Sequence, residues 1–509
     1  MPAQHMIEAP ELERFLVAEG KREADELRSL AAAARAADDL GGAGLAEGIL
    51  QHLPSAQPGR RARLLFLLGF LVHTGNGSAP LTRDAVRDGL DEYLRLLGSP
   101  GLTEQTRVAL LYLLAQFPED RAAIVGRASA APLTDFEQSR LERCLARLDR
   151  TAPVLGRAWP APAGWTLTES ESAADLEWAR GLDAARADFI WEKDTRTLLA
   201  YCGARAYAAL SAPLDDETAE ETAHGTGDGT TDRQPGAAAT GPAADVDVAL
   251  LRCPDCGGGF EGRLPRVRCR SCAAEFDSTA GFLDLSGVEA AGMDQIAGNS
   301  PLYLNTYERL LRPAFLRVTG DNWSDAVTVE DEDRFLVGQL RRTTGPVLDL
   351  AAGAGRWTSV MADSLGADRV IAMDLATAMV QRLRATLPAV AALRGSAENI
   401  PFADASLGAV SCWNALQSMA DPALVVREIG RCLRPGGVLT LLTFTSSTDP
   451  VYRFFQNLHE ECLTVRSFPA DELLRMLTEA GLTVREQRLH GSLLMLTAVR
   501  GRRPGEAHA

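Results

Sequence analysis

Four cysteines in two close pairs are the residues whose chemistry is easiest to infer. They lie in the segments "CPDC" and "CRSC", which twelve residues separate, and they are Cys253, Cys256, Cys269 and Cys272. Each CxxC pair can aim two thiolates at one ion, and two pairs at this spacing are typical of a zinc ribbon. Four protein ligands close a tetrahedral site, so the spacing predicts a structural Zn²⁺ ion and no catalytic one.

A second group of residues has the spacing of a ligand site in an α/β sheet. In "VLDLAAGAGRW" (347–357) an apolar strand runs into a small-residue turn with Gly353 and Gly355, and a helix follows. Glycines let the backbone approach a ligand, and a helix N-terminus offers free N–H groups. The next strand, "RVIAMD", ends at Asp374, which is placed to accept both hydroxyls of a ribose. Asp374 could equally be a helix N-cap, and a glycine-rich turn alone is weak evidence.

The elements that must position these residues begin with a long helical region. Residues 1–211 carry apolar side chains at helical spacing and predict an all-helical domain. Within it, "RLLFLLGF" and "ALLYLLAQF" echo each other 46 residues apart, which fits either a HEAT-like array or an irregular bundle. Residues 212–247 have almost no large apolar side chain, and from residue 213 they hold nine acids and one base. Such a segment predicts a flexible acidic linker.

The rest of the chain changes character. Residues 248–287 contain the four cysteines and predict the zinc ribbon, and residues 288–343 predict a helical connector or lid. From 344 to 500, short apolar strands alternate with amphipathic helices. This alternation predicts a doubly wound, Rossmann-like parallel sheet with helices on both faces. Residues 501–509 form a tail. The fold class is therefore multidomain: all-α, zinc ribbon and α/β.

Composition and charge narrow the function classes. The formal net charge is −16, and half of it lies in the acidic linker. The ribbon holds five arginines and five acids, and its tip "RLPRVRCR" is the one concentrated basic patch. RNA binding usually needs a longer basic track, so RNA is the less favoured partner. The chain has no apolar run long enough for a membrane, no visible secretory signal and no disulfide framework. We expect a cytoplasmic protein with no membrane partner.

Four features together resemble a known enzyme family. They are the glycine turn, the acid at Asp374, "AENIPF" (397–402) and "LRPGG" (433–437). In combination they resemble the class I S-adenosylmethionine-dependent methyltransferases of the ubiquinone-biosynthesis-like type, over residues 303–500. The cysteine module is similar to the ribbon that precedes some methyltransferase domains, including those of certain bacterial ribosomal-RNA methyltransferases.

The resemblance implies a set of cofactor-binding residues. It places the ribose diol on Asp374, with Leu375 and Met379 beneath the adenine and segment 396–398 along the adenine edge. Asp349 and the small-residue turn would line the methionine and ribose part, and Asn414 would face the methionine end. A tyrosine of the connector, either Tyr303 or Tyr307, would close over the cofactor. The full implied set is Tyr307, Asp349, Ala351, Gly353, Gly355, Asp374, Leu375, Met379, Ser396, Ala397, Glu398 and Asn414.

Three positions depart from the family pattern. Ala351 stands where the family usually has glycine, and Ser396 stands where it has an aspartate for the adenine amino group. Gln417 replaces the usual histidine after the fourth strand, which removes the easiest candidate for a general base. None of these changes forbids cofactor binding.

A general base is needed only if the methyl acceptor must lose a proton, because in-line methyl transfer depends largely on proximity and alignment. His459 is the predicted catalytic residue, since it lies in the insertion after the fifth strand, where related enzymes build an acceptor lid. A helix-packing role for His459 is the alternative, and the more frequent one for such a residue. Glu460 and His490 are further candidates, and we interpret His490 as structural in a C-terminal hairpin.

Three functions remain open from the sequence. The first is methyl transfer to a small-molecule or peptide acceptor, of the kind met in specialised metabolism, with the helical domain holding the acceptor or a peptide partner. The second is a zinc-ribbon ribosomal-RNA methyltransferase, which the arginine-rich tip favours. The third is a non-catalytic interaction protein that keeps the fold, which the changes at Ala351, Ser396 and Gln417 leave open.

Overall fold

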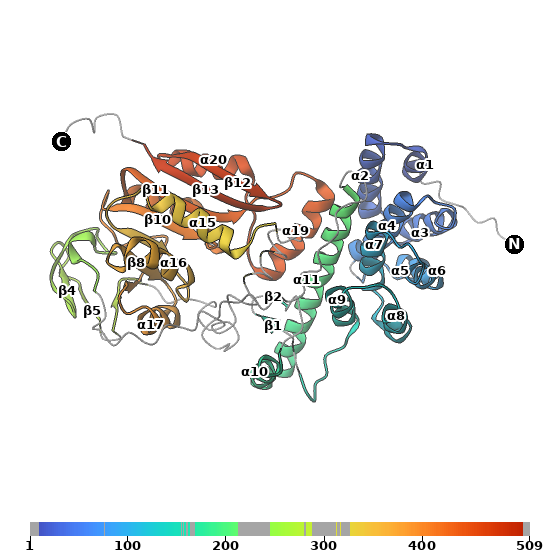
Figure 1. The fold of residues 1–509 in the computed structure, drawn as a ribbon, viewed down its shortest axis with the longest axis horizontal. Coiled ribbons are helices and arrows are strands. Elements are labelled where there is room, and N and C mark those ends of the chain that lie inside the picture. The colour runs from blue at the N-terminus through green and yellow to red at the C-terminus, as the bar shows by residue number, and fades with distance from the viewer. Residues whose placement is uncertain are drawn as a thin grey trace. The chain divides into compact units, whose positions relative to one another are not determined.

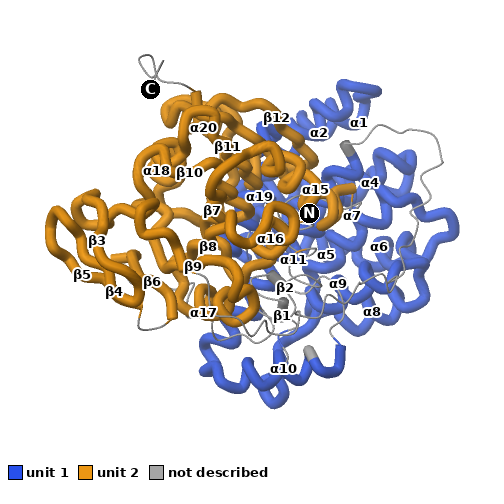
Figure 2. Tube along the Cα trace, turned by 60° about the vertical axis from the view of Figure 1, so that its left-hand side comes forward, with its two compact units in different colours: residues 1–222, 447–463 blue, residues 223–446, 464–509 orange. Residues whose placement is uncertain are grey.

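A computed structural model of the chain describes residues 10–501, except 76, 154, 156, 159–160, 163–167, 212–244, 279–280, 288–311, 313–315 and 317–325. It divides into two compact units (Figures 1 and 2). Unit 1 comprises residues 1–222 and 447–463, and unit 2 comprises residues 223–446 and 464–509. Most of the predicted linker and connector, both Tyr303 and Tyr307, and residues 502–509 lie outside the described residues.

Unit 1 is mostly helical, as predicted. Side-chain caps begin several of its helices: Thr103 accepts a hydrogen bond from the N–H of Thr106, and Thr134 forms a capping box with Glu137. A short two-stranded ribbon, β1 (Arg157–Ala158) and β2 (Ala161–Pro162), interrupts the helices. The helices are α1 (Pro10–Val17), α2 (Lys21–Ala36), α3 (Asp39–His52), α4 (Pro58–Gly75), α5 (Pro80–Arg87), α6 (Leu90–Leu97), α7 (Glu104–Leu114), α8 (Arg121–Ala128), α9 (Asp135–Leu145), α10 (Glu169–Arg180), α11 (Ala184–Ser211) and α19 (Pro450–Leu463).

The two echoing apolar segments form helices that pack directly against each other. They are α4 and α7, and almost every side chain in their middle turns is buried. Phe66 of α4 stacks on Tyr112 of α7 with ring centroids 5.7 Å apart. The echo therefore marks the two central helices of the unit, because a helix that is apolar all round must be covered on every side. A HEAT-like array stays a prediction.

Helix α19 belongs to unit 1, although the sequence around it belongs to unit 2. Phe455 packs against Phe66 and Tyr112, with ring centroids 6.3 and 5.9 Å apart. Gly203 of α11 has no side chain, and a Cβ there would lie 2.2 Å from a ring atom of Phe455, so α11 and α19 approach closely. The predicted domain boundaries placed 447–463 with residues 344–500. The structure assigns this segment to the helical unit, because its aromatic face completes that unit's core.

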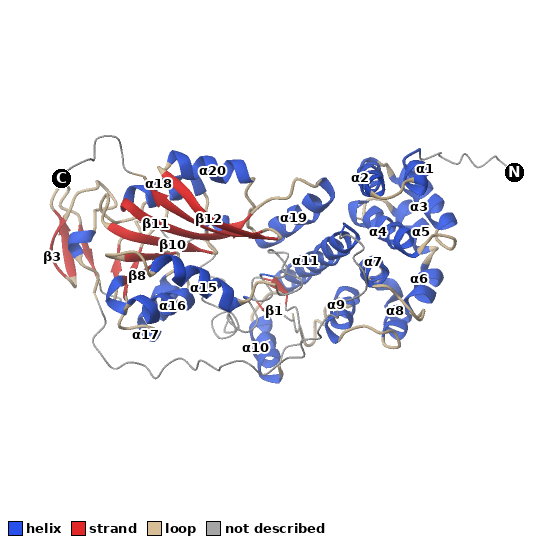
Figure 3. Ribbon diagram, turned by 45° about the horizontal axis from the view of Figure 1, so that its top comes forward, coloured by secondary structure: helices blue, strands red, loops and turns tan. Residues whose placement is uncertain are grey.

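Unit 2 contains an eight-stranded sheet in the order β12-β13-β11-β10-β7-β8-β9-β6 (Figure 3). Neighbours from β11 to β6 are parallel, while β13 runs antiparallel to both β11 and β12. This is the predicted Rossmann-like sheet with a C-terminal hairpin. The strands are β6 (Leu283–Asp284), β7 (Val347–Leu350), β8 (Val370–Asp374), β9 (Ala391–Arg394), β10 (Leu407–Trp413), β11 (Leu433–Phe444), β12 (Leu482–His490) and β13 (Leu493–Arg500).

Helices cover both faces of this sheet. The helices α15, α16 and α17 lie on one face, and α18 and α20 lie on the other (Figures 1 and 3). The central strands β7 and β10 are buried along their whole length, as expected for parallel strands between two helical layers. The helices are α15 (Val329–Leu340), α16 (Arg356–Leu365), α17 (Thr377–Thr386), α18 (Pro422–Cys432) and α20 (Ala470–Glu479).

The cysteine module is a small three-stranded antiparallel sheet in the order β3-β4-β5, within unit 2. Its strands are β3 (Phe260–Arg263), β4 (Arg266–Cys269) and β5 (Glu275–Asp277). The segment that leaves the module, β6, pairs in parallel with β9 and becomes the edge strand of the large sheet. The module therefore continues into the large sheet and is not a separate domain.

Candidate functional site

The predicted cofactor residues gather where β7, β8, β9 and β10 end. Parallel neighbouring strands bring their carboxyl ends to one edge of a sheet, and ligands bind there in open α/β sheets. Two contacts show the gathering directly: the N–H of Gly353 donates to a carboxylate oxygen of Asp374 (2.7 Å), and the N–H of Gly395 donates to the Asp374 carbonyl (3.1 Å). Ser411 of β10 lies beside Asp349 of β7 in the register.

Asp349 is a buried acid near the end of the central strand β7, with 3% of its surface exposed. Its carboxylate accepts a hydrogen bond from the Thr358 hydroxyl at 2.6 Å. Burial raises the pKa of Asp349 to about 7; the hydrogen bond from Thr358 opposes this shift and the charge of Asp374 adds to it. The site therefore holds two neighbouring acids, and a cation beside them would favour their ionised forms.

Asp374 is half-buried at the end of β8, and its carboxylate accepts two backbone hydrogen bonds. The donors are the N–H groups of Gly353 (2.7 Å) and Ala376 (2.8 Å). Both of its oxygens are thus bound to backbone next to the glycine turn and the start of α17. These contacts fix the carboxylate against the glycine turn, and its predicted role as a ribose acceptor stays a prediction.

The turn after β7 depends on left-handed backbone at three positions: Ala351 (φ 57°), Gly353 (φ 56°) and Gly355 (φ 94°). A Cβ on Gly353 would meet no atom within 4 Å, so open space lies beside this part of the turn. A Cβ on Gly355 would lie 2.5 Å from Leu383, so glycine is required there for space as well as conformation. Ala351 adopts the same left-handed conformation with a side chain, which costs about 1 kcal/mol or more. The alanine is therefore a strained substitution.

The loop after β9 carries the next predicted set. Ser396, Ala397 and Glu398 are all half-buried. The Ser396 hydroxyl accepts a hydrogen bond from the N–H of Glu398 (3.3 Å), and a carboxylate oxygen of Glu398 accepts one from the N–H of Asp421 (3.1 Å). The loop is thus shaped by its own polar groups. Of the two residues predicted beneath the adenine, Leu375 is half-buried and Met379 is 3% exposed.

Asn414 follows β10 and is a second residue with strained backbone at this edge, with φ 58°. Its N–H donates to the Leu442 carbonyl of β11 (3.0 Å), and its side-chain oxygen accepts a hydrogen bond from the amide of Gln417 (2.9 Å). Gln417 is 2% exposed and also accepts from the Thr443 hydroxyl (3.3 Å). Gln417 therefore holds Asn414 in place, a positioning role that the sequence did not indicate. Strained residues such as Ala351 and Asn414 tend to cluster at functional sites.

His459 lies on α19, within the core of the helical unit. It is 5% exposed, and within the described part of the chain its Nε2 atom has no hydrogen-bond partner. Burial lowers the pKa of His459 to about 4, against the opposing effects of a hydrogen bond to the Thr197 backbone and of Glu460. A general base works best with a pKa near the working pH and must reach the acceptor. These surroundings argue against the predicted catalytic role and favour helix packing.

The other two proton-transfer candidates have structural contacts. Glu460 forms an ion pair with Arg453 on the same helix, with one N···O distance of 3.0 Å. His490 is half-buried at the last position of β12 and pairs with Leu493 across the hairpin. The interpretation of His490 as a hairpin-strand residue agrees with this placement.

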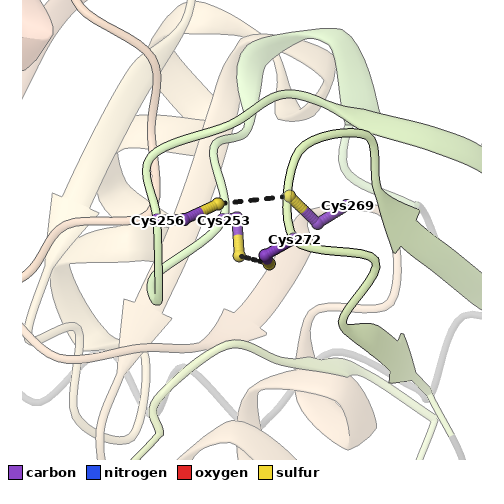
Figure 4. Close-up of side chains that lie close together, drawn as sticks. All are labelled: Cys253, Cys256, Cys269 and Cys272. Carbon is purple, nitrogen blue, oxygen red and sulfur yellow. Dashed lines mark hydrogen bonds between the residues drawn. The ribbon is translucent and has the colours of Figure 1, made fainter.

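The four cysteines of the CxxC pairs converge as predicted (Figure 4). Their Sγ atoms all lie within 4.8 Å of one another, with 3.7 Å between Cys253 and Cys272 and 3.4 Å between Cys256 and Cys269. A regular tetrahedron with Zn–S bonds of about 2.3 Å has S···S edges of about 3.8 Å. Backbone N–H groups, first that of Cys272, lower the pKa of the Cys269 thiol to about 6, whereas burial raises the pKa of the Cys253 thiol to about 12. The geometry and the donor chemistry both fit one tetrahedral thiolate-bound ion.

The arginines at the tip of the module are exposed, but acids lie opposite them. In the register of the small sheet, Arg268 stands between Glu261 and Glu275, whereas Arg266 stands between Asp277 on one side and Arg263 on the other. Residues directly opposite each other on antiparallel strands share a face, so opposite charges offset one another there. The tip is therefore a mixed-charge surface and not a continuous basic one.

Several residues of the site region carried little signal in the sequence. Thr358 binds Asp349, Gln417 binds Asn414, and Asn399 binds residues of the cysteine module. Asn399 lies inside "AENIPF", so the motif pointed to its segment but not to its role. The partners of these side chains lie between 3 and 147 positions away along the chain, and only folding brings the distant ones together.

Comparisons with known proteins agree with this geometry. Residues 347–437 match the family model described as "Methyltransferase domain". The chain contains an S-adenosylmethionine-dependent methyltransferase domain. A demethylmenaquinone methyltransferase of Paenarthrobacter aurescens is 36% identical over 124 residues, which are 24% of this chain and 47% of that protein. A protein of Mycolicibacterium smegmatis named as a probable S-adenosylmethionine-dependent methyltransferase is 31% identical over 159 residues, 29% of this chain and 61% of that protein.

These matches are partial. The chain spans about half the length of the curated relatives it matches. Among solved structures, geranyl diphosphate C-methyltransferase from Streptomyces coelicolor aligns with 34% of this chain and 77% of its own, at 16% identity and a TM-score of 0.30. The search for membrane-spanning helices, made over the described residues, found none with sufficient length and hydropathy.

Proposed function

We propose that the chain is an active S-adenosylmethionine-dependent methyltransferase. The observation that carries the proposal is the contact between the glycine turn and Asp374 at the carboxyl edge of β7 and β8. Asp374 would bind the ribose diol through its carboxylate. The open space beside Gly353 would admit the ligand, and Asp349 would lie near its cationic methionine end. A cationic cofactor suits an edge that holds two acids.

The chemistry of this site needs few protein groups. The cofactor, when bound, supplies an electrophilic methyl group on a sulfonium. The chain binds and orients it: Asp374 fixes the ribose, and Asn414, held by Gln417, fixes the side of the site near β10. Alignment of the acceptor with the methyl group then supplies much of the rate acceleration. We propose no general base, because His459 is buried in unit 1 with a pKa of about 4.

We propose that the cysteine cluster binds one structural Zn²⁺ ion. The four thiols offer the right ligand number, and two of the S···S distances, 3.4 and 3.7 Å, are close to the edge of a zinc–thiolate tetrahedron of about 3.8 Å. Four protein ligands leave no position for a water or an acceptor. The ion would therefore contribute to folding of the module.

For the acceptor we propose a small molecule or peptide. The demethylmenaquinone methyltransferase among the relatives supports a small-molecule acceptor. The mixed charge of the module's tip weakens the ribosomal-RNA alternative, because Arg268 faces acids on both sides and Arg266 faces one across β5. A non-catalytic role finds support only in the three departures from the family pattern. Of these, Gln417 has a positioning role and Ala351 keeps the required backbone conformation.

Calorimetric titration of the zinc-containing full chain with S-adenosylmethionine tests the proposal. We expect saturable binding, and we expect Asp374→Asn to weaken it about tenfold or more, since a charged acceptor of two ribose hydroxyls is lost. Glu479→Gln removes an equal charge from an exposed position on α20 and should leave binding unchanged. Absence of binding by the wild-type chain at millimolar cofactor would favour the non-catalytic alternative.

A further inference from the structure

The cysteine module forms hydrogen bonds to the loop after β9. The side-chain amide of Asn399 donates to the carbonyl of Pro254 (2.9 Å), and its oxygen accepts a hydrogen bond from the guanidinium of Arg252 (3.3 Å). Pro254 lies inside the first CxxC pair, directly after Cys253. Both polar ends of the Asn399 amide are therefore bound to the first cysteine knuckle.

The backbone of the same loop pairs with the strand-like entry to the module. The N–H of Arg252 donates to the carbonyl of Pro401 (3.2 Å), and Leu251 forms an antiparallel bridge with Phe402. Leu251 and Phe402 are 2% and 0% exposed, respectively. Leu251 and Arg252, which form the entry to the module, therefore pair with the second half of the loop as a neighbouring strand would.

A partly buried ion pair strengthens this attachment. Arg252 binds the carboxylate of Glu428 on α18 at 2.9 Å, and the same carboxylate oxygen accepts the N–H of Ile400 at 3.0 Å. The side chains of Arg252 and Glu428 are 21% and 13% exposed, so water screens their interaction only in part. One arginine beside the first cysteine therefore reaches the loop through Asn399, Pro401 and Glu428.

The exit from the module reaches the other half of the adenosine site. Asp284 of β6 forms an ion pair with Arg394 of β9 at 2.8 Å. The Nε atom of Arg394 donates to the carbonyl of Leu375 at 2.8 Å, and Leu375 directly follows the ribose-binding candidate Asp374. The entry contacts residues 399–402, which directly follow segment 396–398, and the exit reaches residue 375 through Arg394; residue 375 and segment 396–398 are expected on either side of the adenine.

A continuous apolar core joins these contacts. Leu251, Phe260 and Val267 of the module belong to the same buried cluster as Ile400 and Phe402 of the loop. The knuckles themselves lack such a core on their outer side, where Cys256 and Cys272 are exposed. Backbone hydrogen bonds, such as that from the Gly257 N–H to the Cys253 carbonyl (2.8 Å), close each knuckle, but without a metal the thiols of the two pairs would meet only through weak S–H contacts.

We propose that the cysteine module is a built-in brace for the adenosine half of the cofactor site, so that metal binding at the four cysteines and cofactor binding at the sheet edge favour each other. This rests on the proposed function. The metal closes the first knuckle, the knuckle holds Asn399, and the loop is ordered before the cofactor arrives. A pre-ordered loop costs less conformational entropy on binding, which raises affinity. Asn399 and Arg252 are positioning residues in this scheme.

The first experiment measures cofactor affinity with and without the metal. Zinc is removed from the full chain with a chelator, and S-adenosylmethionine and S-adenosylhomocysteine are titrated by calorimetry before and after Zn²⁺ is restored. We expect removal to weaken both ligands by about the same factor, between about 5- and 150-fold, because they share the adenosine half. Linkage requires the reciprocal effect: saturating S-adenosylhomocysteine must raise the zinc affinity of the chain by the same factor, measured by competition with the chelator at equilibrium.

The second experiment separates the brace from folding of the module. Asn399→Ala removes the amide contacts and leaves all four cysteines, so zinc content by metal analysis should stay at one ion per chain. We expect affinity for both ligands to fall about fivefold, and exchange protection of residues 396–402 to fall without added ligand. Arg252→Ala should behave in the same way. Arg485→Ala removes an exposed arginine from β12, at the opposite edge of the same sheet, and should change neither quantity.

The outcomes are distinguishable. Failure of the zinc-containing wild type to bind S-adenosylmethionine would overturn the proposed function and this inference with it. Wild-type binding that is unchanged both by zinc removal and by Asn399→Ala would overturn this inference alone. Weakening on zinc removal without any weakening in Asn399→Ala or Arg252→Ala would also overturn it, since the metal would then act by another route.

Discussion

Cofactor binding should release a proton from Asp349. In the free protein, burial and the charge of Asp374 hold the pKa of the Asp349 carboxyl at about 7. A cationic methionine end bound beside it favours the ionised form, so its pKa falls towards the ordinary value of 3.8 in the complex. The complex then carries fewer protons than the free protein, and affinity must decline as pH falls below 7.

The size of the effect follows from these two values. At pH 7 half of the free protein has Asp349 ionised, and at pH 6 about a tenth does. With full ionisation in the complex, the Kd should rise about fivefold between pH 7 and pH 6, and about fifteenfold by pH 5.5. Binding should be measured at pH 7 and below, because the amino group of the cofactor itself titrates between about 7.7 and 8.0.

Calorimetry across this pH range measures how the Kd of the cofactor depends on pH. Repeating the titration in buffers with different ionisation enthalpies gives the number of protons released on binding. Asp349→Asn keeps the shape and an acceptor for Thr358 but cannot ionise. It should bind weakly at every pH and give a flat profile. A flat profile in the wild type would refute the reasoning, and an unchanged slope in Asp349→Asn would assign the proton to another group.

Three further predictions concern stability. Ala351→Gly should raise the free energy of unfolding of unit 2 by about 1 kcal/mol in denaturant melts, because it relieves a left-handed alanine; a lower value would contradict the strain. Gly203→Ala should destabilise unit 1 by about 1–3 kcal/mol, since its Cβ would lie 2.2 Å from an aromatic ring of α19. Gly126→Ala, on the exposed face of α8 with no atom near, is the matched control and should be neutral or stabilising. His73 and His459 both have pKa values lowered to about 4 by burial. The unfolded chain therefore binds more protons, and stability should fall by about 3 kcal/mol for each histidine as pH drops from 6.5 to 4. Replacing both by glutamine should flatten that slope, and wild-type-like methyl transfer by His459→Gln would confirm the packing role.

Much of the candidate site could be predicted because its signals are local. The spacing of the cysteine pairs, the small-residue turn after an apolar strand and the acid ending the next strand each fit within about 25 residues. Parallel strand order then brings strand ends to one edge, so Asp349, Asp374 and Asn414 could be placed together before any coordinates. The Rossmann-like sheet and the helical character of unit 1 could be predicted for the same reason, since period and alternation are properties of short windows.

Long-range packing decided the rest. The sequence by itself determined which residues can bind a metal and which turn can hold a nucleotide-like ligand. Only the tertiary structure decided that α19 completes the helical core and buries His459 there. The aromatic residues of the insertion show that it must pack against something, but they do not indicate which element it packs against. In the same way, Asn399 meets Pro254 across 145 positions, and β6 joins β9 across more than 100. Such contacts depend on how whole elements dock, and docking is set by the summed burial of many side chains rather than by any one motif.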